Sequence, residues 1–292
     1  MLKSYADFTK FGIIIFVILT GLAGYATSYS VEQAFSLQHF IYFVIGLYCL
    51  SSGSLALNQV QEIEADRKMP RTEKRPLVSG KISWATGLVI SLGLLLVGSV
   101  LLFFVSRWAL YLGLATVVLY NGVYTYWWKP KWIYGAVPGA IPGALPVSIG
   151  YAANSDDLLR PDSIYLFLIL FLWQMPHFWA LALRYREDYR LAGVPTLPTI
   201  LGVEKTIYQM GLYTFIYVGL ALASPWFVGA SWIYLLCVLP VSAKLMYEFF
   251  RFYQSKGEKG WLSFFLWINL SVLIYLAVPV IDRWSFLFIK SG

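Results

Sequence analysis

The chain has little charge. Only 13% of its 292 residues are Asp, Glu, Lys or Arg, whereas 59% are hydrophobic and 18% are aromatic. A soluble domain of this size cannot bury so large an apolar fraction. The apolar runs lack the alternating polarity of a membrane β-barrel, and several exceed about 18 residues, enough to cross a bilayer. The composition therefore predicts an all-α polytopic membrane protein.

Cysteine and histidine are also scarce, with two of each. Cys49 and Cys237 both lie inside apolar runs, so we expect them to be buried packing residues. Two such cysteines do not form the framework of a disulfide-rich domain or a cysteine-rich metal site.

The apolar runs predict nine spans in a single domain covering residues 1–292. The first run is longer than a typical signal-peptide core, so we expect it to remain in the protein as a helix. The spans cover about residues 11–29, 37–57, 83–105, 108–127, 133–153, 163–183, 207–227, 230–250 and 262–281.

The basic residues divide unevenly between the two faces that nine spans create. With Lys244, the N-terminal side holds 18 of the 22 Lys and Arg, and the other side holds Arg107, Arg160, Arg283 and Lys290. This asymmetry predicts that the N-terminus and the charged loops are cytoplasmic and that the C-terminus is outside. The +7 net charge then needs no nucleic acid. Because no leader rich in Arg and Ser is seen, we expect a bacterial inner membrane.

Carboxylates concentrate in two of the cytoplasmic loops, and the orientation rule does not explain them. In the first loop, Asn58, Glu62 and Asp66 are spaced i, i+4 and i+8, so they share one face of a helix that continues to Pro70. Oxygen donors in this arrangement suit Mg²⁺, which usually keeps phosphate or water in its remaining positions. A solvated helix end is the alternative, because the spacing alone does not require a metal.

The second loop, in "WQMPHFWALALRYREDYRLAGVPTLPTILG" (173–202), also follows an apolar helix. Its acids Glu187 and Asp188 end predicted span six, just as Asp66 ends span two. The chain therefore resembles two related halves that present acids at one membrane face. Two facing acidic helix ends can hold a diphosphate through bridging Mg²⁺. This predicts catalytic roles for Asn58, Glu62, Asp66 and Asp188, with Glu187 added as a metal ligand.

Cations and aromatic rings surround these acids in the sequence. The basic residues suit phosphate oxygens, although membrane orientation explains them equally well. Aromatic faces can stabilise a carbocation left by a departing diphosphate, although rings at a membrane interface are also common. The predicted diphosphate-binding residues are Arg67, Arg71, Lys74, Arg75, Lys129 and Arg184, and the predicted carbocation or acceptor pocket comprises Tyr124, Trp173, His177, Phe178 and Tyr189.

Three segments together resemble a known family. The pattern N-x-x-x-[DE]-x-x-x-D-x-x-M-x-R-T-x-x-R-P is matched from Asn58 to Pro76. It resembles the first motif of the UbiA-type intramembrane prenyltransferases. The stretch "WQMPHFWALALRYREDYRLAGVPTLP" is similar to the second signature of the haem-prenylating branch. "YTYWWKP" with the following "GAVPGAIPGALPVSIGYAA" resembles the family's fourth-to-fifth helix region.

The resemblance implies a nine-helix UbiA-type bundle with two pseudo-repeated halves and a cytoplasmic active-site cap. It implies that farnesyl diphosphate ionises, its C1 joins a vinyl group of haem B, and water adds to give haem O. The implied partners are Mg²⁺, farnesyl diphosphate, haem B as a substrate, the lipid bilayer, and a downstream haem O-modifying enzyme or oxidase assembly. His177 is then either an axial ligand of haem iron or a residue hydrogen-bonded to a neighbour.

The sequence departs from the family pattern at two positions. Glu62 stands where Asp is common, and Ala192 stands where many members repeat an Asp four residues after Asp188. A second metal site would therefore use Asp188 with Glu187 or water, which leaves the number of metal ions open. Two rival functions also stay open: prenylation of a quinone-ring precursor or chlorophyll-type tetrapyrrole, and transport of an anionic amphiphile.

Overall fold

The structure is a computed structural model that describes residues 2–32, 34–228 and 231–284. All regular structure in these ranges is helical, as predicted. The chain divides into two compact units: unit 1 comprises Met1–Asp157 and Arg186–Thr196, and unit 2 comprises Leu158–Tyr185 and Leu197–Gly292. Lys290 and the C-terminus, which were predicted to lie outside the cell, are not among the described residues.

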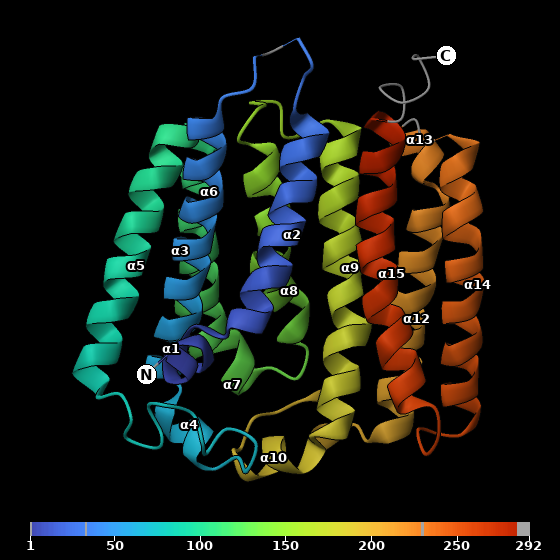
Figure 1. Ribbon diagram of the computed structural model, residues 1–292. Helices are drawn as coiled ribbons and strands as arrows, with labels where there is room; N and C mark the ends of the chain where they lie inside the picture. Colours follow the sequence, from blue (N-terminus) through green and yellow to red (C-terminus); the bar gives the residue numbers. More distant parts are fainter. Residues whose placement is uncertain (1, 33, 229–230, 285–292) are drawn as a thin grey trace. The chain divides into compact units, whose positions relative to one another are not determined.

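Unit 1 contains the acids of both loops (Figure 1). Its helices α4 and α10 lie at the same end of the unit. The helices are α1 (Leu2–Thr9), α2 (Phe11–Ser28), α3 (Leu37–Gln61), α4 (Ile63–Arg67), α5 (Trp84–Val105), α6 (Arg107–Val117), η1 (Val118–Trp128), α7 (Lys129–Lys131), α8 (Ala136–Tyr151) and α10 (Arg186–Leu191).

The packing of unit 1 depends on close backbone approach. Helix α3 packs mainly against α5, and α2 packs mainly against α8. At the second seam, a Cβ atom added to Gly24 would overlap the carbonyl of Val147, and one added to Gly150 would overlap that of Gly21. Small residues let membrane helices approach until their backbones touch, which replaces the hydrophobic driving force that lipid does not supply.

Two irregularities shape the charged end of unit 1. Helix α3 ends at Gln61 and α4 begins at Ile63, because Glu62 leaves the helical region with φ −101° and ψ 13°. The backbone N–H of Glu62 still donates to Asn58 O, and that of Asp66 to Glu62 O, at 3.0 and 2.9 Å. The predicted ladder of side chains therefore persists across a bend that the sequence did not predict.

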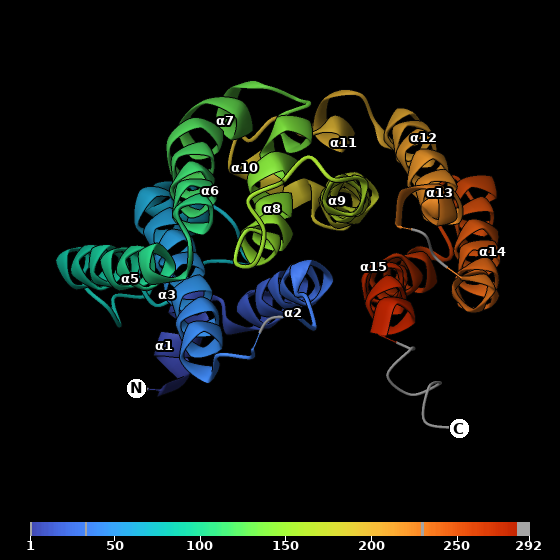
Figure 2. The same cartoon turned by 90° about the horizontal axis from the view of Figure 1, so that it is seen from above.

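Unit 2 is a four-helix bundle with short linking helices. In Figure 2, α9, α12, α14 and α15 surround a shared interior, and each of them contacts two of the others. Cys237, on α14, is exposed, so the expectation that it is buried was wrong; an apolar residue of a membrane helix can face lipid instead. The elements are α9 (Pro161–Arg184), α11 (Leu197–Ile200), α12 (Val203–Leu222), α13 (Ser224–Val228), α14 (Trp232–Gln254) and α15 (Trp261–Trp284).

Five helices of the described residues are long and apolar enough to cross a membrane, namely α2, α3, α5, α9 and α15. The predicted span at 108–127 is divided between α6 and η1, and the one at 133–153 contains α8, which has 16 residues. The count of nine spans therefore stays a prediction.

Candidate active site

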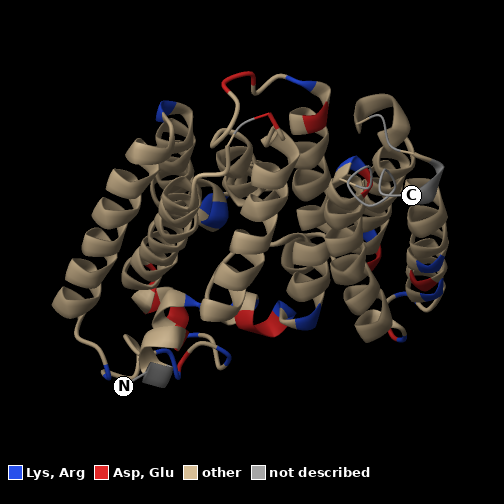
Figure 3. Ribbon diagram, turned by 45° about the horizontal axis from the view of Figure 1, so that its top comes forward, with Lys and Arg blue, Asp and Glu red and all other residues tan. Residues whose placement is uncertain are grey.

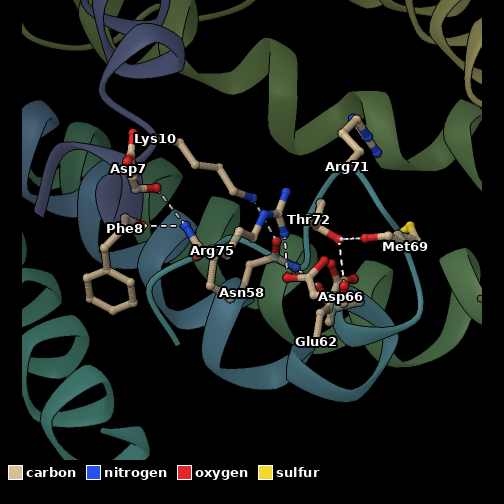
Figure 4. A network of polar contacts seen from close by, with 12 residues as sticks. Asp7, Phe8, Lys10, Asn58, Glu62, Asp66, Met69, Arg71, Thr72 and Arg75 are labelled. Carbon is tan, nitrogen blue, oxygen red and sulfur yellow. Dashed lines mark hydrogen bonds and ion pairs between the residues drawn. The ribbon is translucent and has the colours of Figure 1, made fainter. Parts of the chain in front are cut away.

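The candidate active site lies in unit 1, where α3 bends into α4. Figure 3 shows few charged residues along the lengths of the helices and many near their ends, including the end of unit 1 that carries α4. The oxygen donors predicted from the first loop point toward a common region of this end (Figure 4). Each of them is matched with a different cation.

Asp66 is the most deeply placed of these acids. Its side chain is 1% exposed, and one oxygen, Oδ2, accepts a hydrogen bond from Nη1 of Arg75 at 2.5 Å. The segment that carries Arg75 is fixed by Thr72, whose hydroxyl donates to the Asp66 carbonyl at 2.8 Å. Thr72 and Arg75 of the first motif therefore fold back onto Asp66 of the same motif.

Glu62 and Asn58 have cationic partners from other segments. Nζ of Lys129 donates to both oxygens of Glu62, at 2.5 and 2.6 Å. Nζ of Lys10 donates to Oδ1 of Asn58 at 3.0 Å. Lys129 follows η1 directly and Lys10 joins α1 to α2, so two segments distant in the sequence converge on the α3 ladder.

Helix η1 supports the ladder from behind. Asn58 donates through Nδ2 to the hydroxyl of Thr125, which in turn donates to the Tyr120 carbonyl five residues earlier. Gln61 exchanges hydrogen bonds with Asn121, at 2.9 and 3.0 Å. A π-helical segment of this kind is unusual and is often found at functional sites.

The second loop contributes Asp188 to the same unit. Its Oδ2 accepts from the backbone N–H of Arg71 at 3.3 Å and lies 3.9 Å from the Arg71 Nε. The Arg71 guanidinium also lies 5.8 Å from the ring centre of Tyr189, which is 7% exposed. Arg71 thus connects the two motifs, which are 117 positions apart.

Other predicted residues lie away from this cluster. The carboxylate of Glu187 is 64% exposed and pairs with Arg190 at 2.5 Å. Arg67 pairs with the exposed Glu64 at 2.8 Å, and Lys74 is exposed. Tyr124, by contrast, stacks against Tyr120 in η1, with ring centres 5.7 Å apart, and interacts electrostatically with Glu62 and Tyr189 of the cluster.

Electrostatics within the cluster follow from burial and pairing. Burial alone would raise the pKa of Glu62, but Lys129, Lys10 and Arg75 outweigh it and hold the pKa below its usual range. Burial, and then repulsion by Arg75, lowers the pKa of Lys10 to about 7, although Glu62 partly opposes this shift. The site therefore favours ionised carboxylates and disfavours a further unpaired cation.

The donor set fits Mg²⁺ bound together with phosphate. Oδ1 of Asp66 is buried and has no hydrogen-bond partner, which leaves one carboxylate oxygen directed at no protein group. Among the described residues, no three His, Cys, Asp or Glu side chains are close enough to hold a metal by themselves. Magnesium is commonly bound by one or two carboxylates plus substrate phosphate, which is the arrangement that these residues allow.

Unit 2 holds the predicted aromatic residues of α9. The ring of His177 lies between Trp173, at 4.6 Å, and Phe265, at 5.2 Å. The Phe265 ring stacks on Trp261 at 5.0 Å, and Trp261 lies under the Arg184 guanidinium at 5.7 Å. Arg184, Trp261, Phe265, His177 and Trp173 therefore form a continuous stack, which we call the α9–α15 stack. Phe178 lies beside His177 on α9.

Sequence reasoning missed several residues of these sites. Lys10 has no motif and precedes an apolar run like any orientation-setting lysine. Thr125 and Asn121 lie in a stretch dominated by aromatic residues. Trp261 and Phe265 belong to the last apolar span. A pairing between residues far apart in the chain leaves no local pattern. Of these missed residues, only Thr125 lies in a segment that the sequence singled out, "YTYWWKP".

Comparison with known proteins gives a consistent result. The profile of the UbiA prenyltransferase family matches residues 17–270. A protoheme IX farnesyltransferase from Bdellovibrio bacteriovorus is 57% identical over the full length of both chains. Another, from Shouchella clausii, is 33% identical over 93% of this chain and 88% of its own.

Solved structures share the fold. A digeranylgeranylglyceryl phosphate synthase superposes with a TM-score of 0.75 at 20% identity, covering 96% of this chain and 98% of that one. A UbiA homologue from Archaeoglobus fulgidus, bound to DMAPP and Mg²⁺, has a TM-score of 0.67 at 15% identity, covering 94% and 99%.

Proposed function

Since this chain belongs to the UbiA prenyltransferase family, we propose that it transfers a farnesyl group from farnesyl diphosphate to a vinyl group of haem B, giving haem O and diphosphate. The observation that carries the proposal is a polar cluster in unit 1, which we call the matched cluster. In it, four oxygen donors each face one cation: Asn58 faces Lys10, Glu62 faces Lys129, Asp66 faces Arg75 and Asp188 faces Arg71. The name of the 57% identical relative supplies the acceptor. The five apolar helices make the protein an integral membrane protein.

The cluster suits the departure of diphosphate. The C1–O bond of the donor breaks, and the diphosphate takes the electron pair. Arg71, Arg75 and Lys129 provide donors for the developing negative charge, because preorganised cations stabilise a transition state without reorganising. The vinyl group then attacks C1, and water adds to the resulting cation with loss of a proton. In unit 1, the faces of Tyr124 and Tyr189 are suited to stabilise positive charge at C1.

The expected metal is Mg²⁺, as in the Archaeoglobus fulgidus homologue. Asp66 and Asp188, with Glu62 and Asn58, would hold it, and when bound it would neutralise charge on the departing diphosphate. We place Glu187 outside this set because it is exposed and paired with Arg190. For the same reason, Arg67 and Lys74 are assigned to the surface rather than to the diphosphate.

The α9–α15 stack in unit 2 is the proposed acceptor surface. Aromatic rings suit the planar haem, and Arg184 is a partner for a propionate. The imidazole of His177 is hydrogen-bonded to Asn269, and its buried Nδ1 has no partner. Because both faces of its ring are covered and one nitrogen bonds to Asn269, His177 fits a residue hydrogen-bonded to a neighbour better than an axial ligand of haem iron.

We further propose that nine spans cross a bacterial inner membrane. The N-terminus and the matched cluster would lie on the cytoplasmic side, and the C-terminus outside. A downstream haem O-modifying enzyme or an oxidase assembly would consume the product. The basic-residue asymmetry supports this orientation.

Mass spectrometry of haems extracted from cells with and without the protein tests the reaction. A hydroxyethylfarnesyl haem should appear only when the wild-type chain is present, and it should disappear with Asp66→Ala. A prenylated quinone precursor instead of a haem would reassign the acceptor. Substrate movement without diphosphate formation would indicate a transporter.

A further inference from the structure

Lys10 adopts a backbone conformation that is unfavourable for a lysine. It joins α1 to α2 with φ 55° and ψ 52°, in the left-handed region. Among the described residues, only Lys256 shares a positive φ without being glycine. Glycine adopts this region without steric cost, whereas a side chain makes it unfavourable. Strained residues of this kind persist where the surrounding structure holds them and often lie at functional sites.

Helix α3 holds the Lys10 segment in place. The Gln59 side-chain amide donates from Nε2 to the carbonyls of Asp7 and Phe8, at 3.0 and 2.8 Å. The Phe8 ring is fully buried in a cluster with Ala56, Val60 and Leu77. Gln59 adjoins Asn58, so one turn of α3 both anchors the segment and receives the amino group of its lysine.

The Lys10 amino group enters a region that already contains cations. It donates to Asn58, a neutral amide, while the guanidinium of Arg75 and the amino group of Lys129 both repel it. The carboxylates of Glu62 and Asp66 attract it but are already paired with Lys129 and Arg75. The cluster as a whole has four cations and three carboxylates. A cation placed among other cations needs an anion to offset the repulsion.

We propose that Lys10 binds the diphosphate of the prenyl donor directly and that Gln59 is the residue that positions it. This rests on the proposed function, and it extends the diphosphate site to the N-terminal segment, which neither motif includes. Asn58 then has two tasks, because its amide oxygen holds the lysine close to where the phosphates bind. Diphosphate binding would then explain why a lysine stands at a position where glycine would relieve the backbone strain.

The strain itself supplies a clean test. Lys10→Gly removes the amino group and relieves the backbone, so the variant should fold at least as well as the wild type. Lys256→Gly is the matched control, because Lys256 has φ 51° and a salt bridge to the exposed Glu204. The measurements are the midpoint of thermal unfolding, the KM for farnesyl diphosphate and for haem B, and the Kd for a non-reacting farnesyl thiodiphosphate with Mg²⁺.

We expect Lys10→Gly to raise the Kd for the thiodiphosphate and the KM for the donor by about tenfold or more, the effect of losing a hydrogen bond between charged groups. The KM for haem B should match the wild-type value, and the midpoint of thermal unfolding should equal or exceed that of the wild type. Lys10→Arg should recover part of the affinity, and Lys256→Gly should match the wild type. Gln59→Leu should raise the KM for the donor and leave kcat, measured at saturating donor, unchanged.

Wild-type thiodiphosphate affinity in Lys10→Gly would overturn the proposal, and so would equal losses of donor and haem affinity. Unchanged donor KM in Gln59→Leu would remove the positioning role. Failure of the proposed function would be a different result: the wild-type chain would make no haem O, whereas its affinity for the thiodiphosphate would be measured separately.

Discussion

The two acidic segments of unit 1 use the same residue types in different ways. In the first, Asp66 is 1% exposed and each oxygen donor faces a cation from another segment. In the second, Asp188 contacts Arg71, whereas the neighbouring Glu187 pairs with Arg190 at the surface. Adjacent acids in one helical turn therefore have different environments. Burial and long-range pairing, rather than residue type, separate a candidate ligand from a solvated acid.

Removal of metal should have the largest effect, because the buried acids of both segments are the candidate ligands. We expect EDTA to lower the rate of diphosphate release by at least about a hundredfold, because a cluster with one excess cation cannot neutralise a diphosphate by itself. Added Mg²⁺ should restore the rate, and thermal unfolding should change little. Full activity in EDTA would contradict a metal at Asp66.

Asp66→Asn should cause the next largest loss. Activity should fall by about a hundredfold or more, and stability by about 1–3 kcal/mol, because Arg75 loses its anionic partner in a largely buried site. Denaturant unfolding and diphosphate release measure the two effects. Adding Arg75→Gln should recover stability without activity; a double variant that regains activity would show that Asp66 serves only the ion pair.

The neighbours Asp188 and Glu187 test the comparison within one helical turn. We expect Asp188→Asn to lower the rate about thirtyfold, since it loses both a candidate ligand and its contact with Arg71. The rate of Glu187→Gln should stay within about twofold of the wild-type rate, because exposed ion pairs contribute little. Equal losses in the two variants would return Glu187 to the metal site.

The smallest effect should come from Arg67. Its exposed pairing with Glu64 predicts that Arg67→Gln changes the donor KM by less than about twofold. Arg75→Gln is the matched variant from the same segment and should raise that KM about tenfold. A large effect of Arg67→Gln would place the diphosphate nearer to the surface of α4 than the pairing indicates.

Much of the fold and part of the site could be predicted from the sequence. The helical class, the apolar runs and the shared helix face of Asn58, Glu62 and Asp66 follow from composition, run length and spacing, because these are local properties. The bend at Glu62, the π-helix behind Asn58 and the role of Lys10 could not be predicted. Each depends on a partner more than 40 positions away or on backbone geometry that no residue type dictates.

The sequence by itself determined which residues carry charge into an apolar chain, and at what helical spacing Asn58, Glu62 and Asp66 stand. Only the tertiary structure decided which of those charges are buried and what faces them: Lys10 for Asn58, Lys129 for Glu62, Arg75 for Asp66. The physical reason is range. Helical spacing is fixed by bonds between neighbours in the chain, whereas pairing and burial depend on which distant segments the packed helices bring together.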